Sequence, residues 1–207
     1  MSIDLGEMYK ASRLRVTDLA SDDVAHVPVP ATPLWNVHDV VAHITGVVTD
    51  AMSGNTEAAA TDPWTAAQVE RGRGRTITEM IDEWSANAPM IEGFLSSPEG
   101  DSAFRAVLDI HTHEADLLQA LGKPVVLPDE FLNWGATVLM DGFRAAVAEQ
   151  GLPSVHVQAS SFEVFRGRLG RRSVDEVCGY AWSADPAPYL DAWFVFGTAQ
   201  RSLGETP

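Results

Sequence analysis

The chain has 207 residues, of which 29 are acidic and 14 basic, and its formal net charge is −15. Such a chain repels phosphate backbones and anionic lipid, so the charge argues against a general nucleic-acid-binding or membrane-surface role. Hydrophobic residues make up 45% and charged residues 21%, which is typical of globular proteins and excludes a largely disordered chain. At this length a sizeable core can form without disulfides or structural metals.

The terminal sequence and the cysteine content indicate a cellular compartment. Cys178 is the only cysteine, so an internal disulfide cannot form. The N-terminus MSIDLGEMYK lacks the basic and apolar segments of a secretory signal, and no window approaches the roughly 20 apolar residues of a membrane helix. These features predict a cytoplasmic protein that does not associate with a membrane.

The first part of the chain has the pattern of two helices separated by a proline-rich loop. Apolar residues at helical spacing predict a helix from about Leu5 to Ala20. Three prolines between residues 22 and 34 then require a loop. Asn36 is a good N-cap for a second helix, which Gly54 ends.

Two further helices complete a predicted antiparallel four-helix bundle. The small and polar residues from Gly54 to Arg75 predict a long loop with one or two helical turns. A third helix is expected over residues 77–95, and a fourth begins near the candidate cap Ser102 and stops at Gly122. Four helices with these connections are typical of a bundle over residues 1–125.

The pattern changes in residues 126–207, where we expect a small α/β extension. A fifth helix is predicted from Asp129 to Gln150. The segments VHVQAS and FEVFRGRL alternate apolar and polar residues, which predicts a pair of half-buried strands. A last helical run is expected over about residues 188–196.

Histidine and aspartate occur together at helical spacing on two of the predicted helices. Asp39 and His43 are four residues apart on the second helix. On the fourth helix, Asp109 and His113 are four apart and Asp116 follows three residues later, so these side chains share a face.

A carboxylate and an imidazole one turn apart can bind the same metal ion. With His43 from a facing helix, Asp109 and His113 would form a set of two histidines and one carboxylate, which leaves a position open for water or substrate. Asp116 or Asp39 could then orient a ligand imidazole. The alternative is that these histidines are ordinary helix residues and the acids lie on a solvated face, since short motifs often occur by chance.

Three blocks of the sequence resemble the mycothiol-dependent maleylpyruvate isomerase family of the DinB-like superfamily. WNVHDVVAHITG is similar to that family's N-terminal signature, with Asp39 and His43 at its aspartate and histidine. DIHTHEADLLQALG resembles the second signature, with Asp109, His113 and Asp116 at its acid, histidine and aspartate. FRGRLGRRSVDEVCGYAWSADPAPYLDAWFVFG is similar to a tail found in many actinobacterial members.

The resemblance implies a mainly α, DinB-like bundle that binds a divalent metal, usually zinc, through His43, Asp109 and His113. It also implies a thiol cofactor, mycothiol, which the metal binds as thiolate for isomerisation of, or S-transfer to, a small electrophilic or unsaturated organic acid. A dication favours deprotonation of a thiol, and the thiolate is the nucleophile. The partner would be this small-molecule substrate, with the protein a monomer or homodimer. Asp109 departs from the family, whose first acid is typically glutamate.

Other interpretations of the sequence stay open beside this one. Arg171 and Arg172 stand out in an acidic chain and could hold a substrate carboxylate, or they could pair with acidic side chains and attach the C-terminal segment. The same scaffold could be a metal-dependent hydrolase, in which the ion activates water. It could also be a non-catalytic ligand-binding or interaction module, an alternative that the Asp109 departure keeps open.

Overall fold

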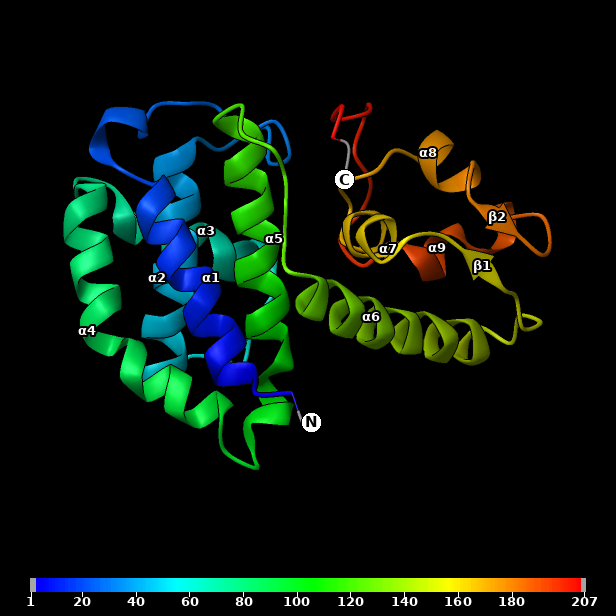
Figure 1. Cartoon of the computed structure of the whole chain (residues 1–207), viewed down its shortest axis with the longest axis horizontal. Coiled ribbons are helices and arrows are strands. Elements are labelled where there is room, and N and C mark those ends of the chain that lie inside the picture. Colours follow the sequence, from blue (N-terminus) through cyan, green and yellow to red (C-terminus); the bar gives the residue numbers. More distant parts are fainter. Residues whose placement is uncertain (1–2, 206–207) are drawn as a thin grey trace. The chain divides into compact units, whose positions relative to one another are not determined.

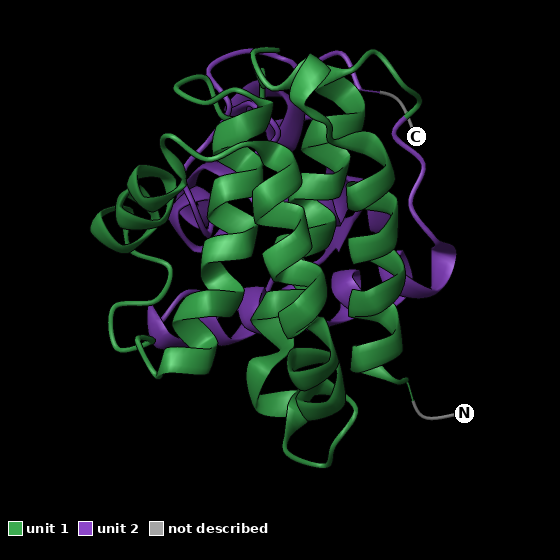
Figure 2. Ribbon diagram, turned by 90° about the vertical axis from the view of Figure 1, so that its left-hand side faces the viewer, with its two compact units in different colours: residues 1–124 green, residues 125–207 purple. Residues whose placement is uncertain are grey.

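The computed structural model describes residues 3–205 and has two compact units, residues 1–124 and 125–207 (Figure 2). The sequence prediction placed this boundary between residues 125 and 126. The chain is mainly α-helical, as predicted, and each unit has its own set of buried apolar side chains. None of the helices described here is long and apolar enough to cross a lipid bilayer.

Unit 1 is built around a four-helix bundle. Helix α1 contacts α4 and α5, and helix α2 contacts the same two helices. In Figure 1, α1 and α5 run upward and α2 and α4 run downward, so α2 and α5 are antiparallel neighbours. The bundle helices are α1 (Leu5–Leu19), α2 (Val37–Ser53), α4 (Ile77–Leu95) and α5 (Phe104–Ala120).

The connection between α2 and α4 contains more helix than the sequence predicted. Because α2 and α4 run in the same direction, the chain must return along the bundle, and α3 (Asp62–Gly72) lies in this return, packed on α2. Two glycines permit the close packing. A Cβ on Gly46 would lie 2.7 Å from the Cβ of Gln68, and one on Gly72 would lie 2.3 Å from the Cβ of Ala42.

Short 3-10 helices in unit 1 alter one predicted boundary. Ser102 does not cap α5, because it lies within the 3-10 helix Gly100–Ala103 and its hydroxyl donates to the carbonyl of Glu99. Helix α5 therefore begins directly after that turn, at Phe104. Another 3-10 helix, Asp22–Val24, lies in the loop that the prolines predicted.

Unit 2 is helical with one small antiparallel sheet. Strand β1 pairs with β2, and Val157 lies opposite Trp182. The predicted second strand FEVFRGRL is instead helix α7, and the last helix is shorter than predicted. The elements are α6 (Asp129–Glu149), β1 (Val157–Gln158), α7 (Ser161–Arg168), α8 (Val174–Cys178), β2 (Ala181–Trp182), the 3-10 helix Ala187–Tyr189 and α9 (Leu190–Trp193).

The burial of α7 explains why its alternating sequence misled the prediction. The side chain of Ser160 caps the helix by accepting from the backbone N–H of Glu163. From Val164 to Arg168 every residue is buried, the charged ones included, so the segment has no polar face exposed to solvent. Alternation predicts a strand only where the polar residues face water.

Candidate metal site

Helix α2 begins with a capping box that places His43 on its second turn. The Asn36 side chain accepts from the backbone N–H of Asp39, and the Asp39 carboxylate accepts from the backbone N–H of Asn36 at 3.1 Å. This arrangement satisfies two N–H groups that a helix start leaves without partners. Asp39 thus orients the start of the helix, and Nδ1 of His43 contacts Gln68 instead, which corrects the sequence proposal that Asp39 orients a ligand imidazole.

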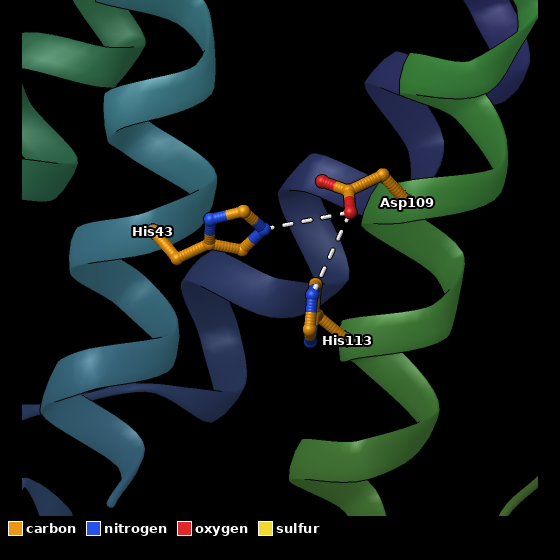
Figure 3. Close-up of side chains that lie close together, drawn as sticks. All are labelled: His43, Asp109 and His113. Atoms are coloured by element: carbon orange, nitrogen blue, oxygen red, sulfur yellow. Dashed lines mark hydrogen bonds and ion pairs between the residues drawn. The ribbon is translucent and has the colours of Figure 1, made fainter. Parts of the chain in front are cut away.

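The structure brings His43, Asp109 and His113 together between α2 and α5 (Figure 3). One oxygen of Asp109, Oδ1, lies 3.5 Å from Nε2 of His43 and 3.6 Å from Nε2 of His113. One ligand atom from each of the three residues lies within 4.8 Å of the others. Both histidines are buried, whereas the Asp109 side chain is 34% exposed, so the cluster is reachable from solvent.

These separations fit a small divalent cation. Zinc binds imidazole nitrogen and carboxylate oxygen at about 2.0–2.1 Å, and in a tetrahedral site two such ligands lie about 3.3 Å apart. The two Asp109 distances are close to this value. An aspartate at position 109 therefore reaches both imidazoles, although it is one methylene shorter than glutamate.

The chemistry of His113 also fits a cation. Its Nδ1 lies 3.2 Å from the carboxylate of the fully buried Asp116, which favours the tautomer with the proton on Nδ1. Burial lowers the pKa of His113, against the opposing effect of the nearby Asp116 carboxylate, so neutral imidazole is favoured. Its Nε2 lone pair then faces the acceptor oxygen of Asp109, and a cation between the two would bind both.

His43 has a partner that the sequence interpretation missed. Its Nδ1 lies 2.7 Å from the amide oxygen of Gln68, on α3, and the amide nitrogen of Gln68 donates to Asp50 at 2.8 Å. Arg71 also donates to Asp50, at 2.8 Å. Gln68 lies 25 residues from His43 in a segment predicted to be mostly loop, so no spacing rule could pair them.

An aromatic ring packs against both histidines. The ring of Trp35 lies 5.3 Å from that of His43 and 6.0 Å from that of His113, centroid to centroid, and the two imidazoles are 4.9 Å apart in an edge-to-face arrangement. Trp35 is the first residue of the segment WNVHDVVAHITG, directly before the helix that carries His43. Its indole limits how far either imidazole can turn.

The sequence of unit 1 matches a known family. Residues 5–118, more than half of the chain, match the model of the mycothiol maleylpyruvate isomerase N-terminal domain. The chain belongs to this family. The matched residues include His43, Asp109, His113, Gln68 and Asp116. The chain matches no curated protein and no solved structure.

Arg171 and Arg172 lie outside the residues that match the mycothiol maleylpyruvate isomerase N-terminal domain. Arg172 donates to Glu163 through Nε and Nη2, at 2.8 and 2.9 Å, and to Glu205 at 2.8 Å. Arg171 donates to the carbonyl of Leu169. These contacts attach the C-terminal residues to α7, and a role for the two arginines at a substrate carboxylate stays a prediction from the sequence.

Proposed function

We propose that the protein is a divalent-metal enzyme, with zinc as its ion, that uses mycothiol or another low-molecular-weight thiol. The reaction would be isomerisation of, or S-transfer to, a small electrophilic or unsaturated organic acid. The family supports the thiol, and the cluster of His43, Asp109 and His113 supports the metal. We further propose that the protein acts in the cytoplasm on this small molecule, as a monomer or homodimer.

Each residue of the cluster has a separate task in this proposal. His43 and His113 would bind the ion through Nε2 and Asp109 through Oδ1, the atoms that converge in the structure. Asp116 holds the proton of His113 on Nδ1, which keeps Nε2 unprotonated. A bound dication would favour the thiolate form of a thiol at its open position. Trp35 and the buried helix faces restrict water around the imidazoles.

The observation that carries the proposal is the convergence of Asp109 Oδ1 on two imidazole nitrogens in a partly exposed position. A structural zinc site has four protein ligands, whereas a catalytic site has three and leaves one position open. The cluster offers three ligand residues within the described part of the chain, which favours the catalytic kind.

Elemental analysis of the purified protein, wild type beside Asp109→Ala, tests the metal site. We expect close to one equivalent of zinc or another divalent metal in the wild type and little in the variant. Asp141→Asn, which removes an exposed carboxylate on α6, is the matched control and should keep its metal. A wild-type protein that stays empty when zinc or nickel is added would contradict the proposal and favour the non-catalytic interpretation.

A thermal-shift measurement then tests the thiol. If mycothiol binds at the metal, it should raise the melting temperature of the metal-loaded wild type and leave that of the Asp109→Ala variant unchanged. No shift in the loaded protein, together with hydrolytic activity in the absence of thiol, would replace the thiol enzyme with a metal-dependent hydrolase.

A further inference from the structure

Gln68 on α3 links the metal cluster to the carboxylate of Asp50, which lies seven residues after His43 on α2. Its side chain is buried, with an exposed fraction of 1%, and both ends of its amide have partners. The oxygen lies 2.7 Å from Nδ1 of His43, and the nitrogen donates to Oδ2 of Asp50 at 2.8 Å. The amide is therefore a bridge between an imidazole and a carboxylate.

Asp50 determines which way this amide points. Burial alone would raise the pKa of Asp50, but hydrogen bonds from Asn55, Gln68 and Arg71 more than offset it and hold the pKa below its ordinary value. At neutral pH Asp50 is therefore an ionised group that can only accept hydrogen bonds. The amide nitrogen of Gln68 must face it, and the amide oxygen must face His43.

The orientation of the amide in turn selects the tautomer of His43. An amide oxygen only accepts, so the short contact to Nδ1 requires the proton of His43 to be on Nδ1. The contact of Nδ1 with Gln68, at 2.7 Å, is much shorter than that of Nε2 with the Asp109 carboxylate, at 3.5 Å, so neutral His43 has its proton on Nδ1 and its lone pair on Nε2. The alternative tautomer would place two acceptors against each other at Gln68 and block Nε2 with a proton.

We propose that Gln68 is a positioning residue for the metal site, which holds His43 in the Nδ1–H tautomer and is itself oriented by Asp50. Gln68 serves His43 as Asp116 serves His113, but from a neighbouring helix and through a neutral group. The importance of this tautomer for metal binding rests on the proposed function, whereas the tautomer itself does not.

Gly46 provides the space that the bridge needs. It lies three residues after His43 on α2, and a Cβ there would lie 2.7 Å from the Cβ and 2.8 Å from the Cγ of Gln68. Any larger residue would push the Gln68 side chain away from α2. The close packing of α2 and α3 at this glycine therefore allows an amide on α3 to reach the imidazole on α2.

Imidazole ¹⁵N NMR of the metal-free protein, at a pH at which His43 is neutral, tests the tautomer directly. The His43 signals are assigned by comparison with His43→Ala. We expect wild-type His43 to be protonated on Nδ1, and Gln68→Met, which keeps the length of the side chain but removes both hydrogen bonds, to shift the population toward Nε2–H. Asp50→Asn should shift it in the same direction, because the amide of Gln68 is then free to turn. Val69→Ala, which removes buried apolar atoms from the same helix, is the matched control and should leave it unchanged.

Zinc competition against a chelator gives the second readout. Loss of an outer hydrogen bond to a ligand typically weakens metal binding by about 10–100-fold. We expect this loss for Gln68→Met and a smaller one for Asp50→Asn, with Val69→Ala close to wild type. If Gln68→Met does not fold, Asp50→Asn and the wild-type spectrum still test the proposal.

Two results would overturn the proposal: a neutral wild-type His43 with its proton on Nε2, or a Gln68→Met protein that folds with an unchanged tautomer and zinc affinity. A wild type that takes up no zinc would contradict the proposed function instead. In that case a shift of the His43 tautomer in Gln68→Met would still support Gln68 as the residue that positions His43.

Discussion

Asp116 lies one helical turn beyond His113 on α5, completely buried, with its carboxylate against the imidazole. A buried carboxylate is costly unless charged or polar groups face it. In this position its negative charge stabilises the Nδ1 proton of His113 and increases the electron density on Nε2. Burial of the Asp116 carboxylate therefore lowers the stability of the fold, whereas its charge strengthens metal binding by His113.

Asp116→Asn separates these two effects. Asparagine has nearly the same shape but no charge, and its amide can present a donor as well as an acceptor to Nδ1. We expect zinc affinity to fall by about 10–100-fold, as for other outer partners of a ligand histidine. Chelator competition measures the affinity, and the exposed Asp141→Asn serves as the control. An affinity equal to that of the wild type would assign Asp116 a purely structural role.

The ligands could be predicted at the residue scale because each follows from local spacing or from the family signatures. Asp109, His113 and Asp116 share a face of one helix, as the four- and three-residue intervals require. Gln68 and Asp50 could not be predicted in the same way. Their roles depend on how α3 packs against α2. No fixed interval along the sequence marks which residues of two such helices will come into contact.

At the scale of the element, helix α7 shows that buried charged residues can make a helix look like a strand in the sequence pattern. Arg166 is fully buried and pairs with Glu205, while Arg168 donates to the carbonyl groups of Ala192 and Trp193 and lies over the Phe143 ring. Each of these partners is more than 20 residues away along the chain. In the sequence the two arginines therefore resembled the exposed positions of a strand.

Glu163 on α7 makes the stability of unit 2 dependent on pH. Burial alone would raise its pKa, but hydrogen bonds from Arg172 and Tyr180 more than offset this and hold the pKa below its ordinary value of 4.5. Because the folded pKa is the lower one, the folded protein binds fewer protons at this site than the unfolded chain. The stabilisation is complete above about pH 4.5 and is lost as the pH falls through the folded pKa.

Glu163→Gln should therefore lower the free energy of unfolding at pH 7 by about 2 kcal/mol, the scale of hydrogen bonds to charged groups. In the variant, the free energy of unfolding should also fall less steeply than in the wild type as the pH drops below 4.5. Urea unfolding between pH 3 and 7 measures both quantities, beside Glu149→Gln on the exposed surface of α6. An acid transition as steep as that of the wild type would show that other carboxyl groups determine the pH dependence.

At the scale of the whole molecule, the candidate site and its supporting residues all belong to unit 1. His43, Asp109 and His113, together with Gln68 and Asp116, lie within residues 1–124. Buried apolar side chains from α1, α2, α4 and α5 form a core inside this unit, and the family match ends within α5. The bundle could be predicted because helical periodicity and caps are local, whereas the short sheet of unit 2 joins segments that the sequence did not connect.

Residues 1–124 expressed alone should therefore fold and bind zinc as the full chain does. The physical reason is that this unit contributes the ligands, the groups that contact the Nδ1 atoms of the two histidines, and the core beneath them. Circular dichroism and urea unfolding measure the fold, and chelator competition measures zinc affinity, with Asp109→Ala in the same fragment as the control. A fragment that folds cooperatively but binds zinc more than about tenfold more weakly than the full chain would show that residues 125–207 contribute to the site, as the sequence hypothesis for Arg171 and Arg172 requires.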